Sequence, residues 1–443
     1  MEGGRNPQLM TSPNSILIRR VLCSSSAEES LPALTSSQKI DHELYVLISL
    51  ILRDFVKKWY NEITHDDAII GEIVSILAHV MRGLEERIRK VDLEAILLDD
   101  IPRILNTHIL DYRTAASRFQ YHNLTLEEYF HHLQPHVALE STESDLLYRT
   151  ALSEGFLALL LPCEDFRSDC ERLILREILG NIILGDALEK LAEPWMIWEI
   201  ITKAIKAIQS EKPKISGNWV LRYHHLIPSI SMVLSTVRNA ALIVYSLVAP
   251  LNKPPTIPFS KTHLTTLIRT LFNLEEAESW ILSQFRLAGS LFMASWMGHM
   301  VDNATSRLLR QCVFREGMVL VILEEARDAL FPNNVLSPPR ERPSQIEQIA
   351  LRKEATETIL SALPRKLLGQ VDAFPHFLEL IRQQLLGETL TMQRKTIEEL
   401  LDCFSNKKIN KYLAYALLDE LLGKLVPEFL VDTIEDIVQV RLG

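Results

Sequence analysis

Hydrophobic residues recur at helical spacing along most of this 443-residue chain. In a clear early example the positions i, i+3, i+4, i+7 and i+11 form one stripe of a helix: Ile48, Ile51, Leu52, Phe55 and Trp59. Charged side chains occupy the opposite side of the same helix: Arg53, Asp54, Lys57 and Lys58. This pattern predicts a chain built from amphipathic helices.

The same spacing predicts further helices, many of them ended by a proline or a polar turn. Their expected ranges are residues 69–90, 112–119, 147–160, 170–181, 227–248, 279–300, 344–363, 374–386, 392–404 and 410–425. A glycine count of 15 and an aromatic content of 7% argue against sheets, which need glycine-rich turns. We therefore predict an all-α fold, with two cooperating lobes because the chain exceeds the ~250–300 residues of one core.

A series of motifs between residues 144 and 201 resembles the second half of the PX-associated (PXA) domain. In chain order the motifs are Tyr148-Arg149, Leu159-Leu-Leu-Pro162, Leu175-Arg-Glu-Ile-Leu-Gly-Asn181 and Glu193-Pro194. The earlier pair Trp59-Tyr60 resembles the opening of the same domain. Because several unrelated motifs occur in the right order, we assign residues 38–209 to a PXA-like domain.

The C-terminal part of the chain resembles the C-terminal domain of sorting nexins. Its motifs are Leu363-Pro364, Asn410, Leu418-Asp419 and Pro427-Glu428. We assign residues 310–443 to this domain, residues 210–309 to a connecting helical region, and residues 1–37 to a disordered tail with one short helix. In the long sorting nexins these two domains flank RGS and PX domains, and we recognise neither of those here.

The resemblance implies that the two domains fold together around an apolar cavity suited to acyl chains. It also implies a cytoplasmic protein, peripheral on an endomembrane such as the endoplasmic reticulum or an endosome. Five cysteines without a CxxC pair fit a reducing compartment. No apolar run reaches the ~18 residues of a transmembrane helix, and the net charge of −10 disfavours nucleic-acid binding.

The chain carries no recognisable catalytic motif: a GxxxxGK[ST] phosphate loop, a GxSxG elbow and an HExxH pair are all missing. His131, His132 and His136 cluster, but Pro135 disrupts the helical geometry that a metal site would need. The acidic pairs at residues 66–67 and 99–100 precede helix boundaries, where carboxylates stabilise free amides. We therefore expect no enzyme activity, no catalytic or metal-binding residue and no cofactor.

Two sets of residues are candidates for lipid contact. The apolar candidates are Phe156, Leu160, Met232, Val244, Met293, Trp296, Met297 and Met300. Methionine side chains adapt to variable apolar partners, although ordinary core packing explains the same spacing. The headgroup candidates are Lys203, Lys206, Lys212 and Lys214, ahead of basic clusters at residues 87–90 and 407–411. A solvated helix face is the alternative for each basic cluster.

The predicted function is non-enzymatic lipid binding, as lipid transfer or phosphoinositide association, in endomembrane organisation or trafficking. The expected partners are a membrane phospholipid, a peripheral membrane surface and a trafficking protein, with no nucleic acid among them. Two alternatives stay open. A helical scaffold would bind a trafficking protein through an exposed apolar groove, and an enzyme of unrecognised class would show buried titratable residues in a pocket.

Residues 38–209 and residues 310–430, expressed as separate fragments, should associate, because the resemblance implies that they share one fold. Co-purification of the two fragments from cells that express both of them checks this expectation. Each fragment expressed alone is the control, and fragments that purify separately would contradict a composite fold.

Overall fold

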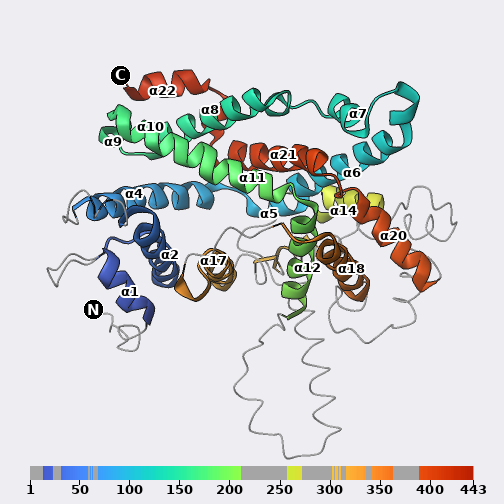
Figure 1. Cartoon of the computed structure of the whole chain (residues 1–443), viewed down its shortest axis with the longest axis horizontal. Helices are drawn as coiled ribbons and strands as arrows, with labels where there is room; N and C mark the ends of the chain where they lie inside the picture. The colour runs from blue at the N-terminus through green and yellow to red at the C-terminus, as the bar shows by residue number, and fades with distance from the viewer. Residues whose placement is uncertain are drawn as a thin grey trace, which may run out of the picture.

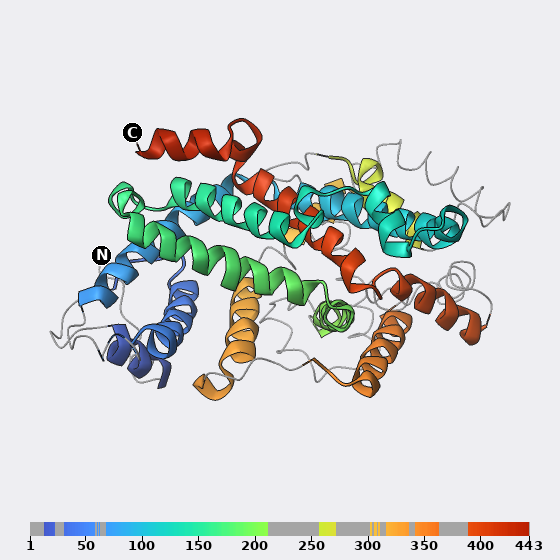
Figure 2. The same cartoon turned by 45° about the horizontal axis from the view of Figure 1, so that its top comes forward.

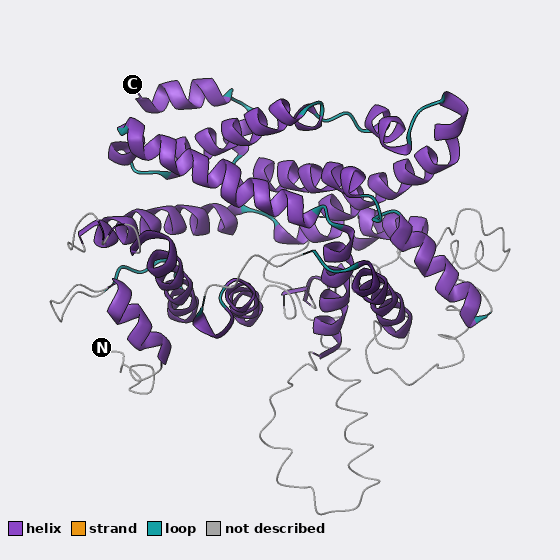
Figure 3. Cartoon of the chain, viewed as in Figure 1, coloured by secondary structure: helices purple, strands orange, loops and turns teal. Residues whose placement is uncertain are grey.

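The computed structural model describes residues 13–22, 31–57, 68–210, 257–271, 316–335, 342–362 and 389–442, with scattered residues near 60 and from 302 to 310. Every regular element within these ranges is a helix (Figure 3). The all-α prediction is therefore confirmed for the part of the chain that the structure describes.

The chain runs back and forth in the upper layer of the molecule (Figure 1). Helices α4 (Ala68–Lys90) and α6 (Ile101–Arg118) run in one direction, and α8 (Thr142–Leu160) returns along them. Helices α10 (Asp169–Glu177) and α11 (Asp186–Leu191) run forward again beside α8. The connecting elements are α5 (Leu93–Ala95), α7 (Leu126–Leu133), α9 (Cys163–Arg167) and the π-helical turns Ile178–Gly185 between α10 and α11.

Helix α21 (Lys407–Leu425) lies in the middle of this layer, although it belongs to the C-terminal part of the chain (Figure 2). It contacts α6, α7 and α11. Its buried residues join core clusters shared with those helices: Ile409, Leu413, Ala414 and Tyr415. Helix α22 (Ile434–Leu442) packs on α8. The two family-like regions therefore form one packed unit.

The N-terminal helices form a second core below this layer in Figure 1. Helix α1 (Pro13–Leu22) packs on α2 (Gln38–Ile51), and α2 packs on α17 (Glu316–Leu330). Ile18 and Val21 are buried in this core. The short helix expected within residues 1–37 is present as α1, and its apolar side packs on α2.

Helix α12 (Pro194–Ser210) leaves the upper layer and packs on α18 (Gln345–Ala362), which packs on α20 (Leu390–Asp402). Trp195 and Trp198 are buried in their shared core, and α14 (His263–Leu271) packs on α6. The helices predicted at 69–90, 147–160, 344–363, 392–404 and 410–425 are confirmed, whereas those at 227–248, 279–300 and 374–386 lie outside the described residues.

His108 joins the two family-like regions inside the core. Its ring is buried against Phe130 and Phe404, and its Nε2 atom lies 3.2 Å from the carbonyl oxygen of Cys403. Burial lowers the pKa of His108 to about 4, because a charged imidazole would lose its hydration, and the hydrogen bond to Cys403 opposes this only in part. The neutral ring therefore donates its Nε2 proton to Cys403.

Acidification should lower the stability of the protein through His108. In the unfolded chain this imidazole regains a pKa near 6.5, so the unfolded state binds more protons than the folded state between pH 6.5 and 4. The penalty on the free energy of unfolding begins below pH 6.5 and reaches about 3 kcal/mol below pH 4. Thermal unfolding of His108→Phe across this range should show a flatter pH dependence, and an unchanged slope would contradict the assignment.

Gly155 allows the turn after α21 to lie against α8. A Cβ atom at Gly155 would lie 2.8 Å from Cε1 of Phe429 and 3.3 Å from Cγ2 of Ile434. Gly155→Ala should displace Phe429 and lower the free energy of unfolding by about 1–3 kcal/mol. The matched control is Gly71→Ala in α4, where no atom lies within 4 Å of the added carbon. That control should raise stability by about 0.5–1 kcal/mol, and equal unfolding midpoints would refute the close-contact argument.

Candidate functional site

Motif residues of each family-like region form hydrogen bonds with residues of the other region. The Tyr148 hydroxyl donates to Asp419 Oδ1 at 2.7 Å, and His136 Nε2 lies 2.9 Å from Asp419 Oδ2. Asn410 donates from Nδ2 to the carbonyl oxygen of Ala192 at 3.0 Å. Several residues that carried the resemblance therefore hold the two regions together.

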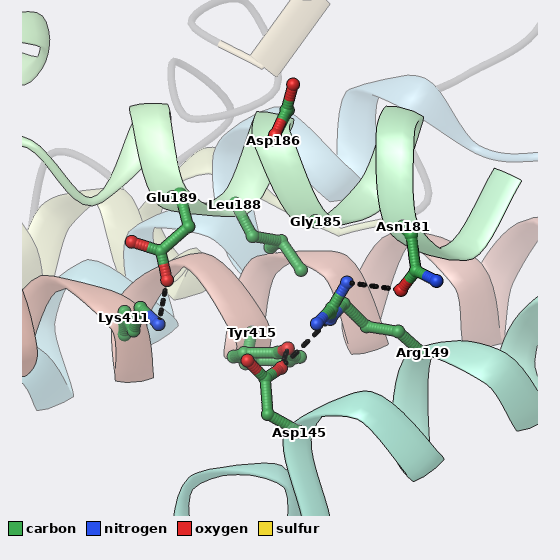
Figure 4. A pocket seen from close by; sticks show the side chains of 9 residues that line it. All are labelled: Asp145, Arg149, Asn181, Gly185, Asp186, Leu188, Glu189, Lys411 and Tyr415. Carbon is green, nitrogen blue, oxygen red and sulfur yellow. Dashed lines mark hydrogen bonds and ion pairs between the residues drawn. The ribbon is translucent and has the colours of Figure 1, made fainter. Parts of the chain in front are cut away.

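Figure 4 shows a polar cavity of about 240 Å³ at this seam, between α8, α11 and α21. Arg149 Nη1 donates to the Gly180 carbonyl at 2.8 Å, and Arg149 Nε lies 3.1 Å from Asp145 Oδ1. Tyr415 donates its hydroxyl proton to the same carboxylate. A Cβ atom at Gly185 would clash with the Arg149 guanidinium, so glycine there leaves the space that Arg149 occupies.

The charges on one side of this cavity are paired with each other. Lys411 and Lys407 both form ion pairs with Glu189, and Lys407 also reaches Glu193 at 2.8 Å. Burial favours a raised pKa for Glu189, but the two lysines outweigh it and lower the pKa below its usual value. Burial, helped by the hydrogen bond to Asp145, raises the pKa of Tyr415, so the hydroxyl remains a donor. The side chains that line this cavity therefore hold α8, α11 and α21 together.

A second cavity of about 490 Å³, which we call the basic cleft, opens between α4, α8 and the C-terminal end of α21. It is lined by His79, Gly83, Glu86, Arg87, Lys90, Leu159, Leu160, Lys424, Leu425, Pro427 and Glu428. The permanent cations are Arg87, Lys90 and Lys424, and the carboxylates are Glu86 and Glu428. Each of these cations forms an ion pair with a carboxylate, and the ion pairs border an apolar wall of leucines.

Arg87 connects the two sides of the basic cleft. Its Nη1 and Nη2 atoms donate to the two carboxylate oxygens of Glu428 at 2.9 and 2.8 Å. This hydrogen bonding lowers the pKa of Glu428, so the carboxylate stays ionised. Across the cleft, Lys424 Nζ lies 3.2 Å from Asp100 Oδ2. Lys424 Nζ also lies 3.7 Å from Glu420 Oε1. The cleft thus holds a guanidinium and an ammonium group, each paired with carboxylates, beside leucine side chains.

The structure brings one predicted lipid contact, Leu160, into the basic cleft. Phe156 lies one turn earlier on the same helix and is half-buried outside the lining. Lys203 and Lys206 lie on α12, outside the lining of either cavity. The remaining candidates lie outside the described residues: Met232, Val244, Met293, Trp296, Met297, Met300, Lys212 and Lys214.

Sequence reasoning missed the cationic side of the basic cleft. The sequence shows the basic cluster that contains Arg87 and Lys90, but it favours the lysines of residues 203–214 as the headgroup site. Nothing local connects it to Lys424, which follows more than 300 positions later. The motif Pro427-Glu428 is the one sequence signal that points to this cluster, because the Glu428 carboxylate is the partner of Arg87.

The histidines and acidic pairs have structural roles where they are described. His131 Nδ1, in the last turn of α7, lies 2.8 Å from the Tyr412 hydroxyl. Asp100 precedes α6 but makes no side-chain capping hydrogen bond, whereas Asp99 accepts the backbone N–H of His263 at 2.8 Å, at the start of the distant helix α14. In the part of the chain that the structure describes, no His, Cys, Asp and Glu side chains gather as metal ligands would. No helix there is long and apolar enough to span a bilayer.

Comparison with known proteins identifies the N-terminal region. A family model for the PXA domain matches residues 37–204. PXA domain protein 1 of Schizosaccharomyces pombe is 31% identical over 173 residues, which are 38% of this chain and 35% of that protein. Sorting nexin-14 of Danio rerio is 26% identical over 162 residues, or 35% of this chain and 17% of the nexin. The chain therefore covers well under two thirds of the length of these relatives.

A third relative aligns along most of the chain. An uncharacterized protein of Saccharomyces cerevisiae is 22% identical over 410 residues, which are 87% of this chain and 79% of that protein. No solved structure matches the chain. The family match, the order of the motifs and the helical fold agree that residues 37–204 form a PXA domain.

Proposed function

We propose that this chain is a non-enzymatic protein of membrane trafficking that binds the headgroup of an anionic phospholipid in the basic cleft. The observation that carries the proposal is the meeting of Arg87, Lys90 and Lys424 with an apolar wall of leucines in one cavity. Similarity to sorting nexin-14 and sorting nexin-13 supports the assignment to trafficking.

The chemistry of the basic cleft suits a phosphodiester. A guanidinium such as that of Arg87 matches the geometry of two phosphate oxygens, as it matches the Glu428 carboxylate here. Lys90 and Lys424 supply further cationic groups at the rim, and Leu159 and Leu160 offer apolar surface for the glycerol end of a lipid. A volume of about 490 Å³ falls within the usual range for ligand cavities.

The two described cavities favour headgroup recognition over enclosure of acyl chains. Both have charged residues in their lining. The family resemblance supports a cytosol-facing endomembrane, the endoplasmic reticulum or an endosome, as the place of action. The lysine pair Lys203 and Lys206 remains a competing headgroup site, so the test must separate it from the basic cleft.

Lys90→Gln and Lys424→Gln should each weaken binding of a soluble short-chain phosphatidylserine about fivefold, because one cation near an anionic headgroup contributes about 1 kcal/mol. Isothermal titration of the full chain measures the affinity. The matched control is Lys203→Gln: Lys203 and Lys90 are 65% and 71% exposed, and each pairs with a glutamate four residues earlier.

Unchanged affinity in the control, with weaker binding in the Lys90 and Lys424 variants, would support the basic cleft. Weaker binding in the Lys203→Gln variant, with unchanged affinity in the Lys90 and Lys424 variants, would instead place the headgroup site on α12. A wild-type chain that binds no phospholipid would overturn the proposal and favour a helical scaffold for a protein partner.

A further inference from the structure

The helix that runs from α10 to α11 exposes a long apolar stripe. Residues 169–191 form one unbroken helix, in which the π-helical turns Ile178–Gly185 join α10 to α11 (Figure 2). The exposed side chains of the stripe are those of Cys170, Ile174 (52%), Ile178 (40%), Ile183 (52%), Ala187 and Leu191 (45%). At the helical rise per residue the stripe is about 30 Å long. Contiguous exposed apolar surface of this kind marks an interaction site.

The opposite side of this helix is already packed. Leu175 and Leu179 pack against the core cluster of α8, and Leu188 belongs to a core cluster shared with α21. Arg172 Nε and Arg176 Nη1 lie 3.2 and 3.3 Å from carboxylate oxygens of Glu154 on α8. These contacts fix the rotation of the helix about its axis, so the apolar stripe stays on the outside.

The spacing of the stripe is the same when it is read from either end. Its six residues follow one another at steps of four, four, five, four and four positions. The step of five falls in the π-helical turns, whose hydrogen bonds span five residues. Two copies of this helix placed antiparallel, with the midpoint between Ile178 and Ile183, therefore bring Ile178 against Ile183 and Ile174 against Ala187. A two-fold interface between identical chains needs such a self-complementary pattern.

The exposed charges fit the same antiparallel arrangement. Glu171 and Lys190 are exposed, and neither forms an ion pair with another residue in the ranges that the structure describes. Both are equally far from the midpoint, so Glu171 of one copy comes level with Lys190 of the other, and the two-fold axis repeats this contact. Asp186, which points away from the polar cavity (Figure 4), comes within one residue of the level of Arg176. Because Arg176 is already held by Glu154, the charge complementarity rests on Glu171 and Lys190.

We infer that the apolar stripe is a dimer interface, in which a second copy of this chain packs its own stripe antiparallel against the first. An anionic bilayer is a poorer occupant, because the exposed carboxylates of Glu171 and Asp186 beside the stripe repel anionic headgroups. No residue of the stripe lines the basic cleft. The inference therefore does not depend on the proposed function of that cleft.

Sedimentation of the full chain across a concentration series tests the interface. The wild type should form a dimer, and Ile178→Asp/Ile183→Asp should weaken its association about tenfold or more, because carboxylates would enter an apolar contact. The matched control is Ile346→Asp/Ile349→Asp on α18, whose side chains are 81% and 69% exposed. The control should dimerise as the wild type does. A wild type that stays monomeric would overturn the inference, and so would equal weakening in the control.

Charge reversal tests the antiparallel arrangement without changing an apolar residue. Glu171→Lys and Lys190→Glu should each weaken the dimer about fivefold, because like charges then meet twice across the two-fold axis. The double variant Glu171→Lys/Lys190→Glu restores opposite charges and should recover the association of the wild type. Both positions are exposed, so the variants should keep the helical content of the wild type by circular dichroism. Unchanged single variants, or a double variant that fails to recover, would contradict the interface.

Discussion

The docking of helix α21 against α6, α7 and α11 is the interaction on which the rest of the structure depends. One side of α21 supplies apolar residues to the shared cores. Its polar side chains find their partners far back in the chain: buried Asn410 bonds to the carbonyl of Ala192, 218 positions earlier. A buried polar group left without a partner costs about 1–3 kcal/mol, so these bonds restrict α21 to one register.

Both cavities are consequences of this docking. The polar cavity needs α8 and α11 on one side and α21 on the other, and the basic cleft needs α4 and α8 beside the end of α21. Arg87 and its partner Glu428 are 341 positions apart. Neither family-like region contains a complete lining by itself, so whatever the cleft binds is bound by the two regions together.

The cations of the basic cleft lie where two helix ends meet. Arg87 and Lys90 lie in the last turn of α4, and Lys424 lies in the last turn of α21. Cationic side chains at these positions stabilise the negative end of a helix dipole, so each helix has its own reason to carry them. The fold brings both ends to one place, where each cation also finds a carboxylate partner.

The helices could be predicted from the sequence, because their apolar spacing and caps depend on residues only three or four positions apart, as in the Thr125 and Glu128 capping box of α7. The sequence also indicated the PXA domain through ordered motifs. Only the packing of the helices shows that the helix at residues 13–22 packs on α2 and that Leu160 and Lys424 line one cavity. Helical periodicity shows which side of a helix is buried, but the identity of the covering helix depends on contacts between distant residues.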